Sequence, residues 1–149
     1  MRRTLTLILA AFALAVAALP SLAQAPAPTS LAKESAKEML TAYRFNRAEG
    51  MLATEDRCWR EAKASRKAPA VSALGCARLL IAGGVIDQAM QVTEQRGPVA
   101  AFAPAIQRTR YMERAAGLGM TPAAAQDVLV KAVNDIPLII EGLSEAGLR

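Results

Sequence analysis

The chain has 149 residues, 53% of them hydrophobic, and carries a formal net charge of +5 at pH 7 with no histidine. Without histidine it lacks the commonest general base, the serine–histidine and cysteine–histidine nucleophile pairs, and histidine metal sites. Two cysteines alone cannot build a closed zinc site, and no glycine-rich nucleotide-binding motif occurs. We therefore expect no metal and no cofactor.

The first 23 residues have the layout of a secretory signal peptide. Two arginines precede an apolar run over 5–19, and small residues precede the expected cleavage site between Ala23 and Gln24. The apolar run is shorter than the roughly 20 residues that cross a membrane. We expect cleavage there, a periplasmic or secreted protein, and no integral membrane span after cleavage.

Loss of this leader leaves 16 basic against 13 acidic residues, so the mature net charge is +3. Because much of the basic character belongs to the leader, charge and export together argue against a nucleic-acid partner. A Pro/Ala spacer is expected over 24–30, since alternating prolines favour extended chain. The remainder, 31–149, has the length of a single domain.

Hydrophobic periodicity predicts helices from the start of this domain. The first is expected over 31–47, with Thr29 or Ser30 as its cap, and the second over 51–66. A bend is expected near 47–54, because Gly50 weakens a continuous helix by about 1 kcal/mol relative to alanine.

A third helix over 70–82 carries one charge, Arg78, and we expect it to be the buried central helix. Arg78 should reach the surface or pair with an acid, and Gly75 should allow a neighbouring helix to approach closely. Gly83-Gly84 is expected to end this helix. A fourth helix over 85–95 should follow, and its predicted inner face consists of Val85, Ile86, Ala89 and Val92.

Two further helical regions complete the domain. Residues 98–118 should be helical with an interruption at Pro104, which lacks a backbone donor. Thr121 and Pro122 start the last region, where Pro137 marks a kink or a new helix. No strand-like alternation occurs, so the predicted fold class is an all-α bundle of five to seven helices. The predicted inner face of 98–118 consists of Phe102, Ile106, Thr109, Met112 and Ala116.

Cys58 and Cys76 are the only cysteines, and in an exported chain we expect them to form one intrachain disulfide. Closing such a loop restricts the unfolded chain and contributes about 3 kcal/mol. Two separate buried thiols are the alternative. A redox-active pair is less favoured, because catalytic dithiols usually have two residues between the cysteines.

Basic residues gather in two places, over 57–67 and over 108–114. Together they suggest an electropositive surface for an acidic partner or an anionic envelope polymer; a solvated helix face is the simpler interpretation. Tyr111 is expected on the second ridge. The basic residues of this predicted surface are Arg57, Arg60, Lys63, Arg66, Lys67, Arg108, Arg110 and Arg114.

From Met51 onward the chain resembles the small exported immunity proteins of bacterial type VI secretion amidase effectors. The matching residues are ATEDRC at 53–58, then Cys76 leading into IAGGVID at 81–87, and the helix that starts at Thr121 and ends before Pro137. The turn is longer by a glycine than in the family, and later cysteines of the family are absent. The resemblance implies an envelope protein that binds and blocks a peptidoglycan-degrading toxin.

We therefore expect an exported, non-enzymatic helical binding protein, most concretely an inhibitor or immunity protein whose partner is a secreted hydrolase. An envelope structural or stress-related protein that binds unfolded chains or the cell wall is the alternative. A carboxylate-only hydrolase is the least favoured. Its candidate acids are Glu49, Glu55, Asp56 and Glu61.

Overall fold

The computed structural model describes residues 28–148 and contains five α-helices, one short 3-10 helix and, among those residues, no strand. The predicted all-α bundle is confirmed. Residues 1–27, including the predicted signal peptide, lie outside the described part of the chain. The elements are α1 (Pro28–Ala64), α2 (Pro69–Thr93), η1 (Ala100–Phe102), α3 (Pro104–Gly117), α4 (Pro122–Asn134) and α5 (Ile136–Glu145).

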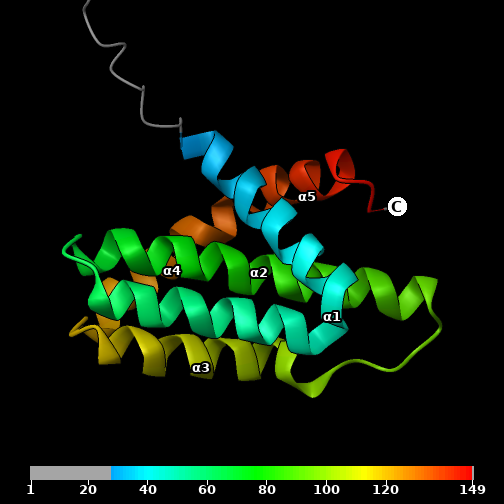
Figure 1. Ribbon diagram of the computed structural model, residues 1–149. Helices are drawn as coiled ribbons and strands as arrows, with labels where there is room; N and C mark the ends of the chain where they lie inside the picture. The colour runs from blue at the N-terminus through cyan, green and yellow to red at the C-terminus, as the bar shows by residue number, and fades with distance from the viewer. Residues whose placement is uncertain (1–27, 149) are drawn as a thin grey trace, which may run out of the picture.

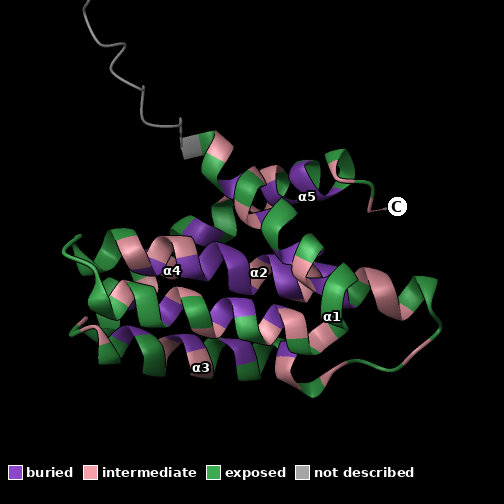
Figure 2. Cartoon of the chain, viewed as in Figure 1, coloured by how far each residue is buried: buried purple, intermediate pink, exposed green. Residues whose placement is uncertain are grey.

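Helix α2 lies at the centre, and every other element packs against it (Figure 1). Buried positions follow α2 and the faces of its neighbours that are turned toward it (Figure 2). By length and composition, α2 is the one helix in the described region that could cross a membrane, but half of its most apolar window is buried within the bundle. The prediction that 70–82 forms the buried central helix is therefore confirmed, although these residues belong to a longer helix, α2.

The prediction that Gly83-Gly84 ends a helix is wrong, because α2 continues through both residues to Thr93. The two glycines instead make room for neighbours. A Cβ on Gly83 would lie 2.9 Å from the ring of Phe102, and one on Gly84 would lie 2.9 Å from the side-chain amide of Gln107. Gly75 was predicted to allow such an approach, but a Cβ on it would have nothing within 4 Å.

Two charged residues lie within α2, and both are buried and paired. The guanidinium of Arg78 donates to Asp135, at the junction of α4 and α5, over 2.7 Å. Asp87 accepts from Arg96 over 2.8 Å and from the backbone of Val99 over 3.3 Å, so it orders the loop after α2. Pairing of Arg78 with an acid, one of its two predicted outcomes, is confirmed.

Helix α1 begins at Pro28, so residues 28–30 belong to a helix and not to the predicted spacer. Its two halves meet at a kink, where Asn46 and Arg47 leave the helical conformation. Arg47 has φ 51°, which is strained for a residue with a side chain. Its guanidinium donates to Glu94, lies 5.2 Å from the ring of Tyr43, and so ties the kink to the end of α2.

The predicted bend near 47–54 is present at the start of that range, at Arg47. Gly50 lies beyond this kink, inside the second half of α1, and does not itself interrupt the helix. A Cβ at Gly50 would lie 2.3 Å from the carbonyl oxygen of Ala42, in the first half. Glycine is therefore required because the two halves approach each other closely. Gly142 has the same role where α5 crosses α1, since its Cβ would lie 2.7 Å from the Cα of Lys33.

The predicted inner face of 98–118 is displaced from the observed one. Phe102 is buried, but Ile106 is 50% exposed, and the buried positions of α3 are Gln107, Tyr111 and Ala115. Gln107 is buried because its amide donates to the carbonyl of Leu80 over 2.7 Å. Hydrophobicity alone excludes a glutamine from a core, so the periodicity selected the wrong residues.

The last two helices confirm the local signals around them. The Thr121 side chain caps α4 by accepting from the backbone N–H of Ala124. Pro137 lies in the first turn of a new helix, α5, so a new helix forms there. Helix α5 packs across the first half of α1, where Glu141 and Glu145 face Lys33.

The disulfide between Cys58 and Cys76 is present and joins the second half of α1 to α2. It lies where two groups of buried side chains meet. One group gathers where the first half of α1 and α5 meet α2, around Met39, Ile86 and Ile139. The other lies around Trp59 and Tyr111, between α1, α2, α3 and α4.

The glycine contacts predict opposite effects for two substitutions of the same kind. Gly50→Ala should lower the free energy of unfolding by about 1–3 kcal/mol, because the added methyl overlaps the Ala42 carbonyl. Gly75→Ala should raise it by about 0.5–1 kcal/mol, because alanine is the better helix former and has open space there. Urea unfolding followed by circular dichroism measures both. A Gly50→Ala protein as stable as the wild type would contradict the close approach at the kink.

Candidate functional site

Four of the predicted basic residues gather where α1 turns into α2. Arg60 and Lys63 lie on the last turns of α1, and Arg66 and Lys67 lie in the connection to α2; all four are exposed. No ion pair forms with any of them within residues 28–148. We call these four residues the basic end of the molecule. In Figure 1 it lies at the left, where the α1–α2 and α3–α4 connections are neighbours.

The other four predicted basic residues have partners. Arg57 pairs with Glu38 over 2.7 Å, and Arg114 pairs with Asp56. Arg108 donates to the Gln126 side chain over 3.3 Å. Acids therefore neutralise part of the predicted surface, whereas Arg108 has only an uncharged partner and the four residues of the basic end have no ionic partner within residues 28–148. Tyr111, expected on the basic ridge, is fully buried and donates to the carbonyl of Ala125, so that expectation is wrong.

Arg110 makes the most buried of these pairs. Its guanidinium binds both carboxylate oxygens of Glu55, over 2.9 and 2.7 Å, and the Glu55 side chain is 3% exposed. Burial raises the pKa of Glu55 above its ordinary 4.5, while the charge and hydrogen bonds of Arg110 oppose that rise. The pair joins α1 to α3 and is a structural contact, not a free binding site.

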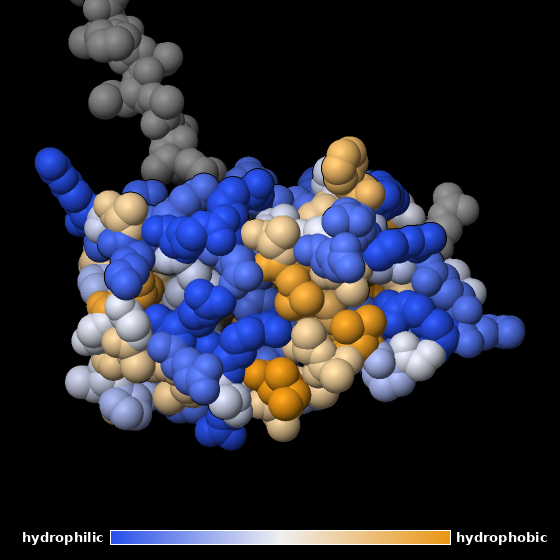
Figure 3. Space-filling model, turned by 60° about the horizontal axis from the view of Figure 1, so that its bottom comes forward, coloured by the Kyte–Doolittle hydropathy of each residue, from blue (hydrophilic) through white to orange (hydrophobic). Residues whose placement is uncertain are grey.

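Two hollows adjoin the basic end, and Lys63, Gly117 and Leu118 line both of them. The larger, of about 270 Å³, is also bordered by Arg60 and by the only tryptophan, Trp59. The smaller, of about 160 Å³, reaches the start of α2. Cations thus surround a partly apolar depression. The face in Figure 3, which brings the α3 side forward, is largely hydrophilic, with hydrophobic side chains interspersed.

Trp59 forms the apolar part of the larger hollow and is 3% exposed. Its ring meets Tyr111 edge-on, with centroids 5.8 Å apart. Its indole N–H is buried and has no acceptor among residues 28–148. A buried donor without an acceptor costs about 1–3 kcal/mol, so this residue is an unsatisfied group beside the basic end.

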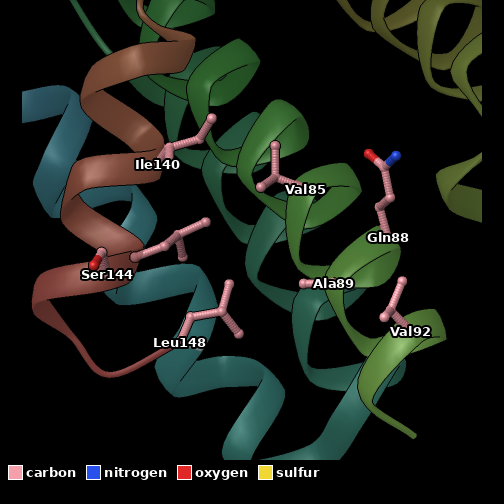
Figure 4. Close-up of a pocket in the computed structure, with 8 residues that line it drawn as sticks. Val85, Gln88, Ala89, Val92, Ile140, Ser144 and Leu148 are labelled. Atoms are coloured by element: carbon pink, nitrogen blue, oxygen red, sulfur yellow. The ribbon is translucent and has the colours of Figure 1, made fainter. Parts of the chain in front are cut away.

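A second surface feature was not predicted from the sequence. An apolar groove of about 460 Å³ runs between the C-terminal half of α2 and α5. Figure 4 shows Val85 and Ala89 on α2 facing Ile140 on α5, with Leu148 closing one end. Val92 was predicted to point inward, but it is 79% exposed at the groove's edge. Periodicity places these residues on one face of α2 but cannot show that α5 leaves that face partly uncovered.

The acids considered for hydrolysis do not converge. Glu55 and Asp56 are paired with arginines of α3, whereas Glu49 and Glu61 are exposed on α1. Within residues 28–148, no group of three or more aspartate, glutamate, cysteine or histidine side chains could hold a metal ion.

No protein-family model, curated protein or solved structure significantly matches the chain.

The division between paired and unpaired cations predicts different costs for two arginine substitutions. Arg110→Ala should lower the free energy of unfolding at neutral pH by about 3–5 kcal/mol, because it leaves the buried Glu55 carboxylate without its partner. Arg57→Ala, which removes an exposed pair, should cost no more than about 1 kcal/mol.

The cost of Arg110→Ala should depend on pH. With the partner gone, burial keeps the Glu55 pKa above 4.5, so the folded state takes up a proton more readily than the unfolded state. Stability is then lost as pH rises through the raised pKa, and the deficit relative to wild type shrinks toward pH 4.5. Urea unfolding across this range measures it. An Arg110→Ala deficit that does not change with pH would show that Glu55 is not the unpaired charge.

Proposed function

We propose that the protein is an exported, non-enzymatic binding protein whose partner is another protein. Its concrete role is to bind and block a cell-wall-degrading effector. The observation that supports this most is the basic end, where four cations lie together without acidic partners among residues 28–148. The helix dipole favours a cation in the last turn of α1, such as Lys63, but it does not account for Arg66 and Lys67 in the connection that follows. A partner with an acidic surface would supply the opposite charges that this cluster lacks.

Electrostatics also suits such a task. A concentrated patch of one sign speeds the encounter with an oppositely charged protein and selects against wrong partners. The disulfide at Cys58 and Cys76 holds the last turns of α1 against α2, so the cations are displayed from a rigid support. The leader sequence and the resemblance to immunity proteins add export and a cell-wall-degrading partner to this picture.

A second candidate function is favoured by the apolar groove. In this case the protein is an envelope stress protein, and the groove holds an apolar segment of an unfolded chain. Exposed Val92 and Ile140 are side chains that such a segment would cover. This candidate requires broad, weak binding, whereas the first requires one specific partner.

The experiment is growth rescue in a bacterial host that produces a cell-wall-degrading effector of the same strain in its periplasm. The wild type should restore growth, and Lys63→Glu should not, because a like charge facing an acidic partner weakens binding by roughly tenfold or more. Arg57→Glu changes the net charge equally but lies at a neutralised position, so it should still restore growth.

The outcomes separate the two candidates. If the wild type neutralises none of the strain's effectors, the blocking role is refuted. If rescue is lost in Val92→Glu and kept in Lys63→Glu, the groove is the contact surface instead. The stress-protein role then predicts that the wild type, but not Val92→Glu, slows the aggregation of a chemically unfolded protein.

A further inference from the structure

The hollows at the basic end have a mixed chemistry that describes their occupant more closely than charge alone. Within the described part of the chain, Arg60, Lys63 and Lys67 border them without ionic partners, and a single unpaired acid, Glu113, stands opposite. The local field is therefore positive. Unpaired cations around a depression favour a ligand that carries several negative charges.

Apolar side chains form part of the walls between these cations. Trp59 and Leu118 line the larger hollow, and Ala62 and Pro69 line the smaller. A phosphate polymer carries negative charges that can pair with the cations, but it has no apolar group to pack against these walls. A peptide offers both, because carboxylates can reach the rim while an apolar side chain enters the depression.

The hollows are also open where they meet. Gly117 ends α3 and lines both of them, and a Cβ there would have nothing within 4 Å. The absence of a side chain leaves open space beside the three residues, Lys63, Gly117 and Leu118, that line both depressions. An extended segment of a few residues can therefore lie across Lys63 from one to the other.

We propose that these hollows bind an acidic segment of the partner protein in which aspartates or glutamates flank one apolar residue. The carboxylates lie over Arg60, Lys63 and Lys67, and the apolar side chain packs toward Trp59 and Leu118. This inference rests on the proposed function for the identity of the partner, but the recognition it describes belongs to residues 59–69 and 117–118 and can be measured without that partner.

Trp59 provides the measurement, because it is the only tryptophan of the chain. The purified full-length protein is titrated with a short synthetic peptide in which aspartates and glutamates flank one leucine, while Trp59 fluorescence is recorded. A saturable change is expected, with an affinity that falls as salt is added. Two control peptides follow. One replaces the acids by asparagine and glutamine, and the other replaces the leucine by glycine; both should bind about tenfold more weakly or worse.

Three protein variants locate the site. Lys63→Glu should weaken peptide binding by roughly tenfold to a hundredfold. Gly117→Leu leaves the charge unchanged but obstructs the hollows, and it should weaken binding to a similar degree. Arg57→Glu should leave the affinity within about threefold, since Arg57 lines neither hollow and is already paired with Glu38. Thermal melts of all three variants verify that they are folded.

Several results would overturn the proposal. They are no peptide binding by the wild type, full binding by Gly117→Leu, or equal binding of the acidic peptide and its glycine control. Polyphosphate or anionic lipid vesicles that bind more tightly than the peptide would show that the ligand is an anionic polymer or surface. A further outcome is that the wild type restores growth and Lys63→Glu does not, while the wild type does not bind the peptide. That combination would support the proposed function and refute this mode of recognition.

Discussion

The structure depends on the burial of α2. From Pro69 to Thr93 this helix contains two charged side chains, Arg78 and Asp87, and both lie below the surface. A charge taken out of water must be paired. Asp135 meets Arg78, and Arg96 meets Asp87. These two pairs fix the junction of α4 with α5 and the loop after α2, so the same helix supplies both the apolar core and the positions where the chain reverses.

The neighbours of α2 are held to it and to each other by local means. The disulfide attaches the second half of α1, and Gly83 and Gly84 admit Phe102 and Gln107 from the following segment. The first half of α1 turns away at the kink and is covered by α5, where Lys33 and Lys37 bind Glu145. Those hydrogen bonds hold the pKa of Glu145 at about 2. Many acids of the chain are thus paired along the bundle, while Glu61 and Glu113, near the basic end, have no ion pair among residues 28–148.

Sequence patterns predicted the features that depend on neighbouring residues. The Thr121 cap, the interruption of the helix at Pro137, the central position of 70–82 and the cysteine pair all follow from short stretches, although a kink and a new helix at Pro137 could not be told apart. Features that depend on distant residues were not predictable. From the sequence alone, Gly83-Gly84 indicates a helix end, because the contact of Phe102 with Gly83 is visible only in the structure. Gln107 would be predicted to lie on the surface, because its hydrogen bond to the Leu80 carbonyl is visible only in the structure.

The same distinction applies to the candidate site. The sequence places eight cations in two groups, but it does not show which acids will face them. Glu55 lies next to Asp56 in α1, and only the packing of α3 brings Arg110 and Arg114 against these two acids. The remaining cluster of Arg60, Lys63, Arg66 and Lys67 is therefore a result of the fold. The apolar groove also required the structure, because it exists only where α5 stops short of covering α2.

The central claim is that the basic end is where the molecule meets its partner. The most direct measurement is acetylation of lysines in the free protein and in its complex with the neutralised effector, with the reactivity of each lysine read by mass spectrometry. Lys63 and Lys67 should become protected in the complex, while Lys131, exposed on α4, should react equally in both states. Unchanged reactivity of Lys63 and Lys67 in a verified complex would contradict the claim.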